Sequence, residues 1–211
     1  MRYYKLTDKL NNGEVIKEDN DNSYRYYFGT EKWIKTGIMI EYQWPEDELF
    51  GKYTEISESE AKQFLNMQRN KLNELYELAK QISKKNRTGQ AGKDENLYVN
   101  HPMNPANSLE NTEHKIVALL YNIFEDKGVT VDDMRSYGFT DRIINSICIL
   151  TKKNSMSYEK YLASVKTDSN ACAVKMADLK HRIDVCKIPD PSEKDLEQIE
   201  KYKKALQFLE N

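Results

Sequence analysis

The side chains that could do chemistry gather in a few short segments between residues 87 and 182. They are Arg87, His101, the run from Tyr121 to Asp126 and the run from Lys175 to Arg182. Imidazole and carboxylate groups are ligands for divalent metals, and guanidinium and ammonium groups bind phosphate. These residue types therefore point to a site for a phosphorylated ligand.

Several other chemistries are excluded by the sequence. It contains no glycine-rich phosphate loop, no Gly-x-Ser-x-Gly motif and no Cys-x-x-Cys pair. No apolar run approaches the roughly 20 residues that span a bilayer, and the opening residues lack the apolar core of a signal peptide. The net charge of -2 gives no overall attraction to nucleic acid or acidic lipid. We expect a cytoplasmic protein that binds neither nucleic acid nor membrane.

The elements before residue 57 are predicted to be strands. This stretch is rich in Tyr and Trp and is broken by turn signals. The candidate strands are 2–6, 14–17, 24–28, 32–35 and 38–42. They predict a small antiparallel β domain over residues 1–56. Its aromatic residues could mediate homodimerisation or docking of a partner protein, although core packing explains most of them equally well.

Residues 57–211 are predicted to form a helical domain. Ser57 and Glu60 fit a capping box at the start of a long helix, and Thr130 and Thr140 fit helix N-caps. Apolar residues at helical spacing follow each start. We expect helices over about 57–84, 112–128, 140–150, 157–165, 169–184 and 192–209, and a further short helix that begins after Thr130. The predicted fold class is mainly α, an all-helical bundle with a small N-terminal antiparallel β domain.

Five motifs occur in order along the helical domain. They are Gly89-Gln90, Tyr98-Val99-Asn100-His101-Pro102, Ala118 through Asp126, Val174-Lys175-Met176-Ala177-Asp178, and Ile188 through Tyr202. This set resembles the hydrolase half of RelA/SpoT-type alarmone enzymes, which belong to the histidine-aspartate (HD) phosphohydrolase superfamily. The resemblance covers about residues 75–211 and implies an HD-domain-like bundle.

The resemblance also implies a divalent metal, most commonly manganese, held by His101, a His-Asp pair and Asp178. Here Tyr121 and Asn122 stand where that His-Asp pair belongs. A phenol with an ordinary pKa near 10 is neutral at cellular pH, and an amide offers no negative charge. We therefore expect the metal to be bound weakly or not at all. His101 is then interpreted more readily as a buried imidazole bonded to Asp178 than as a ligand.

Other positions departing from the family pattern favour binding over cleavage. Arg87 and Arg182 stand where the resemblance implies His and Asn. Each adds a guanidinium that could hold phosphate without a metal. Glu125 and Asp126 match an acidic pair that positions water and metal in the family, but two acids near a helix end are equally interpreted as a solvated pair.

Three functional hypotheses follow. The leading one is a degenerate HD-domain protein that binds a phosphorylated nucleotide or small anion, with weak or no hydrolysis, through Arg87, Lys175 and Arg182 beside Tyr121 and Asn122. The second is an active pyrophosphohydrolase of an alarmone-like nucleotide. It would place His101 and Asp178 on a weakly held manganese, with Glu125 or Asp126 orienting water. The third is a structural module that uses the β domain for dimerisation or docking.

Overall fold

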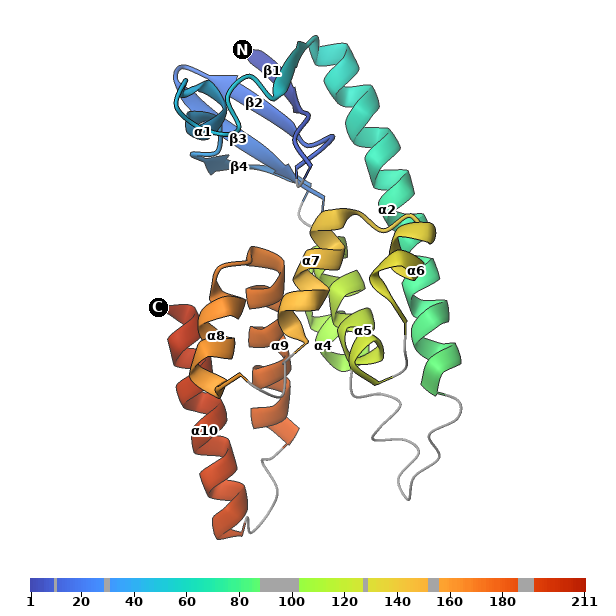
Figure 1. Ribbon diagram of the computed structural model, residues 1–211, viewed down its shortest axis with the longest axis vertical. Coiled ribbons are helices and arrows are strands. Elements are labelled where there is room, and N and C mark those ends of the chain that lie inside the picture. Colours follow the sequence, from blue (N-terminus) through green and yellow to red (C-terminus); the bar gives the residue numbers. More distant parts are fainter. Residues whose placement is uncertain (10, 29–30, 88–102, 127–128, 152–155, 186–191) are drawn as a thin grey trace. The chain divides into compact units, whose positions relative to one another are not determined.

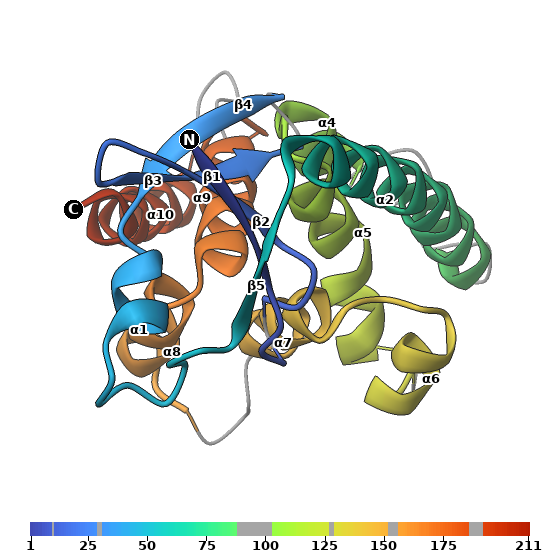
Figure 2. The same cartoon turned by 90° about the horizontal axis from the view of Figure 1, so that it is seen from above.

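The structure of the chain is a computed structural model that describes residues 1–9, 11–28, 31–87, 103–126, 129–151, 156–185 and 192–211. The side chains of residues 86, 87, 103, 104, 125, 126 and 185 lie outside this description. The chain divides into two compact units, Met1–Glu74 and Leu75–Asn211. The division falls inside helix α2 (Glu58–Arg87), an unbroken helix in Figures 1 and 2. The first half of α2 thus belongs with the strands, whereas the sequence analysis divides the chain at residue 56.

The first unit is built on an antiparallel sheet. Its strands in the described residues are β1 (Arg2–Leu6), β2 (Val15–Asp19), β3 (Asn22–Tyr27), β4 (Lys32–Thr36) and β5 (Tyr53–Ile56). The spatial order is β4-β3-β2-β1-β5. Tyr4 pairs with Ile16 on one side and with Glu55 on the other. The chain therefore runs as a meander from β1 to β4 and returns along the free edge of β1 as β5.

A helix covers each face of this sheet because side chains alternate along β1. Tyr4 and Leu6 face Ile16 and pack with helix α1 (Met39–Gln43). Tyr3 points the other way and packs with Val15 and the start of α2. The unit thus buries apolar side chains of β1 and β2 on both faces of the sheet, which a strand-only meander of this size could not do.

One predicted strand of the first unit is wrong. Residues 38–42 are expected to be extended because Ile, Met and Tyr suit strands, but the structure forms α1 at Met39–Gln43. Met39 and Tyr42 are both buried, and a spacing of three residues puts them on one side of a helix but on opposite faces of a strand. Strand β5 has no counterpart among the predicted strands.

The second unit is helical, as predicted. After α2 it contains α4 (Met103–Ser108), α5 (Thr112–Asp126), α6 (Val131–Ser136), α7 (Asp141–Leu150), α8 (Tyr158–Lys166), α9 (Ser169–Val185) and α10 (Glu193–Glu210). Helix α9 contacts α4, α5, α7, α8 and α10, and α8, α9 and α10 lie side by side in Figure 1. Val174 and Leu179 of α9 are fully buried. Helix α9 is therefore the central element of this unit.

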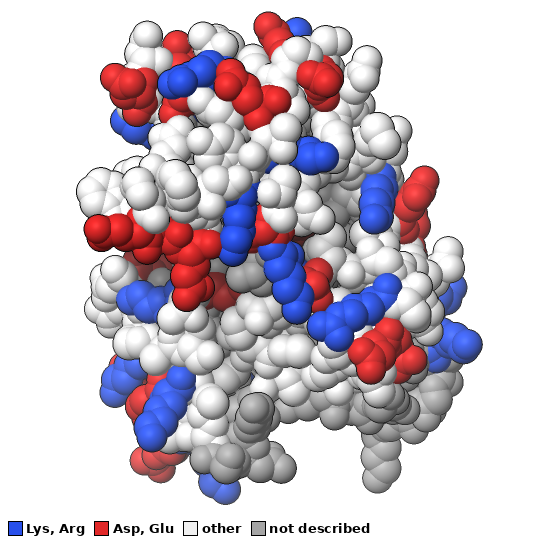
Figure 3. Space-filling view, turned by 45° about the horizontal axis from the view of Figure 1, so that its top comes forward, with Lys and Arg blue, Asp and Glu red and all other residues white. Residues whose placement is uncertain are grey.

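Surface charge and helix composition agree with an ordinary folded chain. On the face drawn in Figure 3, basic and acidic side chains are interspersed. No helix in the described part of the chain combines the length and apolar character needed to cross a bilayer.

Candidate functional site

Asp178 is a buried carboxylate in the middle of α9, with 1% of its surface exposed. Lys175 precedes it by three residues and Arg182 follows it by four, so all three share one helix face. Arg182 Nε donates to Asp178 Oδ1 at 2.9 Å and to Oδ2 at 3.0 Å, and Lys175 Nζ donates to Oδ2 at 3.2 Å. One buried carboxylate thus holds two cations.

Asp178 and Arg182 stabilise each other's charged forms. Burial alone would raise the pKa of the Asp178 carboxyl, but Lys175 and Arg182 outweigh that effect and hold the pKa below its usual range. Burial also opposes the charge on Arg182, and the Asp178 carboxylate more than offsets it, so the pKa of Arg182 is raised. Among the side chains that the structure describes, the ion pairs at Asp178 join two cations to one carboxylate, a formal excess of one positive charge.

Tyr121 joins the cluster from α5, which packs on α9. Its side chain is buried, and Asn122 beside it is half-buried. Burial first and then the charge of Asp178 raise the pKa of the Tyr121 phenol, while hydrogen bonds with Asn122 and Arg182 act in the opposite direction. The phenol is therefore neutral at cellular pH, and it acts here as a hydrogen-bonding group.

Three further tyrosines lie at this cluster, two against the cations and one beside them, and none of the three is among the predicted site residues. The Arg182 guanidinium carbon lies 5.9 Å from the ring centre of Tyr202 on α10, and Lys175 Nζ lies 5.6 Å from the ring centre of Tyr161 on α8. The Tyr158 and Tyr161 rings are 6.0 Å apart. The distances from Arg182 to Tyr202 and from Lys175 to Tyr161 suit cation–π contacts. The spacing of Tyr158 and Tyr161 on one helix face was the available signal, but the sequence does not show which face of α8 packs on α9.

Several predicted site residues cannot be placed in this cluster. His101 lies outside the described residues, and so do the side chains of Arg87, Glu125 and Asp126. Among the predicted site residues, the structure brings together Asp178, Lys175, Arg182, Tyr121 and Asn122.

The described donors do not fit a divalent metal at Asp178. Both carboxylate oxygens already accept hydrogen bonds from cationic side chains, and the neighbouring phenol is neutral. Unit charges about 4 Å apart repel by about 4 kcal/mol at an effective dielectric constant near 20, and a dication doubles that repulsion for each cation. The described residues contain no group of three or more His, Cys, Asp or Glu side chains arranged to hold a metal ion.

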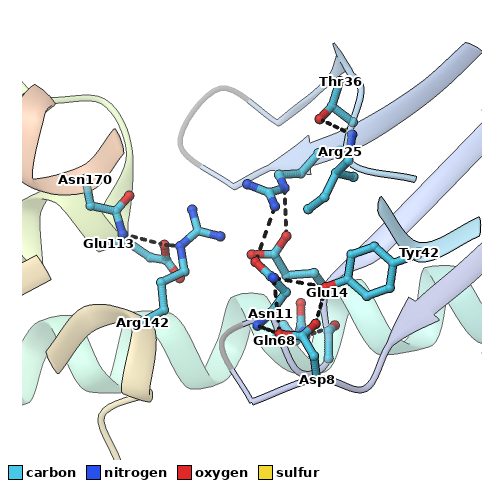
Figure 4. Close-up of polar contacts among 12 residues, drawn as sticks. Asp8, Asn11, Glu14, Arg25, Thr36, Tyr42, Gln68, Glu113, Arg142 and Asn170 are labelled. Carbon is cyan, nitrogen blue, oxygen red and sulfur yellow. Dashed lines mark hydrogen bonds and ion pairs between the residues drawn. The ribbon is translucent and has the colours of Figure 1, made fainter. Parts of the chain in front are cut away.

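A second polar cluster in the helical unit links α5, α7 and α9. Glu113 Oε2 accepts a hydrogen bond from Asn170 Nδ2 at 3.3 Å and pairs with Arg142 Nε at 3.3 Å (Figure 4). Burial lowers the pKa of the neighbouring His114, and Arg142 adds to this effect while Glu113 opposes it. These contacts connect three helices, so we interpret this cluster as stabilising their packing.

A polar network in the first unit anchors the β1–β2 connection to α1. Tyr42 donates a hydrogen bond to Asp8, and Asn11 Nδ2 donates to the Tyr42 hydroxyl at 3.0 Å (Figure 4). Arg25 Nε pairs with Glu14 Oε2 at 2.7 Å. Burial, followed by the bond to Asp8, raises the pKa of Tyr42. Its hydroxyl therefore stays protonated, as a donor to a carboxylate must be.

Comparison with known proteins adds no family assignment. No protein-family model matches the chain, and no curated protein matches it. The HD-like relationship therefore stays a prediction from the motifs, and the chemistry of the site has to be argued from the side chains around Asp178.

Proposed function

We propose that the helical unit binds a phosphorylated nucleotide or a similar anion at Lys175 and Arg182 without a metal. The observation that carries this proposal is the excess positive charge around Asp178, where two cations share one carboxylate. A partly buried positive site attracts phosphate more strongly than a solvated one because the local dielectric constant is lower.

Arg182 is the residue best suited to contact the anion. Its side chain is 35% exposed, whereas that of Lys175 is 15% exposed. A guanidinium carries five N–H donors. The Nε–H group bonds to Asp178, and Tyr121 and Tyr202 also form hydrogen bonds with the guanidinium, so two of the five donors are left. Arg182 can therefore remain bonded to Asp178 and still offer donors to a phosphate oxygen.

The tyrosines favour a nucleotide over a simple anion. Tyr158 is 37% exposed, and the charges of Asp178 and Arg182 both influence its pKa, which burial raises first. Its ring neighbours that of Tyr161, which contacts Lys175, and it is partly open to solvent. An aromatic face of this kind can stack on a base while Arg182 holds the phosphates.

Thermal stability measured with added ligands tests this proposal. Guanosine tetraphosphate and pyrophosphate, each supplied with a metal chelator, should raise the melting temperature of the wild-type chain. Arg182→Gln should lose most of that increase. The matched control is Lys180→Gln, which removes an exposed cation of the same helix that pairs with Glu210. The proposal fails if neither ligand stabilises the wild-type chain.

The hydrolase hypothesis makes a different prediction for the same preparation. The protein would release pyrophosphate from guanosine tetraphosphate only when manganese is present, and a near-stoichiometric manganese content of the purified protein would overturn the metal-independent proposal. Elemental analysis and a turnover assay would detect both. Binding in the presence of a chelator, together with no turnover in the presence of manganese, favours the metal-independent proposal.

A second candidate function is protein docking through the first unit. Ile40, Trp44 and Phe50 are 69%, 58% and 51% exposed, and Glu41 and Glu46 nearby are exposed acids. An apolar surface with acidic neighbours fits a partner segment that is both apolar and basic. An amphipathic helical peptide of Leu and Lys should shift the emission of Trp44, and a Leu and Glu peptide of equal length should not. Equal responses to both peptides would remove this candidate.

A further inference from the structure

The HD resemblance implies that Asp178 binds a divalent cation. In the structure, Asp178 instead forms ion pairs with the side chains of Lys175 and Arg182. We infer that Arg182 and Lys175 replace the metal ion at Asp178, so that two single positive charges of the chain occupy the position of one double charge. This inference concerns the site of the proposed function, but it does not require that an anion binds there.

The hydrogen-bond geometry supports direct replacement. A metal ion bound to a carboxylate needs the oxygen lone pairs, at roughly 2.0–2.6 Å. Arg182 Nε lies 2.9 Å from one oxygen of Asp178 and 3.0 Å from the other, and Lys175 Nζ lies 3.2 Å from the second. Both oxygens therefore accept hydrogen bonds already, and an incoming dication would compete with these bonds and be repelled by both side-chain cations.

Arginine is the more effective of the two substitutes. A lysine can lose its proton and make room for a metal, but the guanidinium keeps its charge at any pH in a cell. Lys175 and Arg182 are also carried by the same helix as Asp178, so they are present at the carboxylate without a binding step. No free ion at cellular concentration has that advantage.

The surrounding aromatic rings hold both cations near Asp178. Tyr202 of α10 lies against Arg182, and Tyr161 of α8 lies against Lys175. Each ring limits the rotamers of the side chain that it contacts. Tyr121 donates neither a charge nor an imidazole, so no described neighbour on α5 draws a metal toward the site. Tyr121 and Arg182, in place of the His and Asn that the resemblance implies, thus both disfavour metal binding.

The inference predicts that restoring the His-Asp pair alone does not restore metal binding. We would compare three variants of the full chain: Tyr121→His with Asn122→Asp, the same pair with Arg182→Asn added, and the same pair with Lys180→Asn added as a control of equal charge. Manganese binding to each, with no nucleotide present, is measured by electron paramagnetic resonance of the free ion. We expect the variant carrying Arg182→Asn to bind at least tenfold tighter than the other two.

The inference is overturned if the first variant binds manganese as tightly as the one with Arg182→Asn, or if Lys180→Asn has the same effect. Melting curves show whether each variant is folded. If the variant with Arg182→Asn does not fold, Arg182→Gln takes its place, because it retains more of the side-chain stem. Anion binding by the wild-type chain is measured separately, so its absence would remove the proposed function and leave this inference standing.

Discussion

The Asp178 side chain is buried, and both of its oxygens are bonded to cations. Water therefore cannot take the place of Lys175 or Arg182 beside it. Asp178→Asn would leave Lys175 and Arg182 without a counter-charge. We expect the free energy of unfolding to fall by about 3 kcal/mol, near the lower end for removing one partner of a buried pair, because Arg182 can turn partly toward water. Urea unfolding followed by circular dichroism measures the loss.

The control for this prediction is Asp132→Asn in α6. Asp132 is 92% exposed and contacts Arg135 at 3.2 Å. Removing a charge from such a pair should cost less than about 1 kcal/mol. Equal losses at Asp178 and Asp132 would contradict the assignment of Asp178 as the anchor of two cations.

Because His114 is buried, the stability of the folded chain should depend on pH. Burial is the largest cause that lowers its pKa in the folded chain, whereas the unfolded chain binds a proton with the ordinary pKa of about 6.5. Below that value the unfolded state gains protons that the folded state resists, so stability should fall as pH decreases from 7 to 5.5. His114→Gln should reduce that slope, and identical slopes in urea unfolding over this range would contradict the prediction.

At the scale of elements, helices were easier to predict than strands because their starts carry a local signal. Ser57 and Glu60 form the expected capping box, with Glu60 Oε2 accepting from Ser57 N at 2.8 Å. Thr130 and Thr140 cap α6 and α7 as predicted. Each cap involves residues three positions apart, so the sequence contains the whole interaction. The pairing of β5 with β1 joins residues about 50 positions apart and leaves no such signal.

Gly13 connects β1 to β2, and the structure explains why a glycine is needed there. Its φ is +85°, and an added Cβ would lie 2.8 Å from Gln68 Nε2. Gly51 has a φ of +72° but no atom within 4 Å of that position. Gly51→Ala should cost about 1 kcal/mol from the backbone alone. Gly13→Ala should cost about 1 kcal/mol more, because Gln68 must move and lose its bond to the Gly13 carbonyl.

Thermal unfolding of both glycine variants beside the wild-type chain gives the difference. An equal loss at Gly13 and Gly51 would mean that Gln68 adjusts without cost. A larger loss at Gly51 would contradict the proposed contact between α2 and the β1–β2 connection.

At the scale of the whole molecule, the amino-acid composition does not predict where one compact unit ends and the next begins. Residues 1–56 differ from the rest in Tyr and Trp content, which places the expected boundary at the last strand. In the structure Ala61 and Leu65 of α2 cover Tyr3 and Val15. Helix α2 continues beyond them without a change of composition, so nothing in the sequence marks residue 74.

The same argument applies to the candidate site. Asp178, Lys175 and Arg182 could be selected from one helix face, and Tyr121 from the motif that contains it. Tyr202 and Tyr161 could not be selected, because only the packing of α8 and α10 on α9 brings their rings to the cations. The spacing of Asp178 and Arg182 allows their ion pair, but the sequence does not show that Asp178 would be buried.

Truncation tests the boundary of the first unit. A fragment of residues 1–74 should unfold cooperatively, because it keeps the half of α2 that covers the sheet. A fragment of residues 1–57 would expose the apolar face formed by Tyr3 and Val15 and should be unfolded or aggregated. Circular dichroism and analytical ultracentrifugation distinguish the two results. A 1–57 fragment with the same transition as 1–74 would contradict the assignment of α2 to this unit.

The two tryptophans of the chain, Trp33 and Trp44, both belong to the first unit, while the helical unit has tyrosines around its cations. Indole emission therefore reports on the sheet unit alone, whereas the 14 tyrosines are shared equally, seven in each unit. A change in tyrosine absorbance without a change in indole emission would therefore indicate that the helical unit melts on its own, and this comparison needs no attached dye.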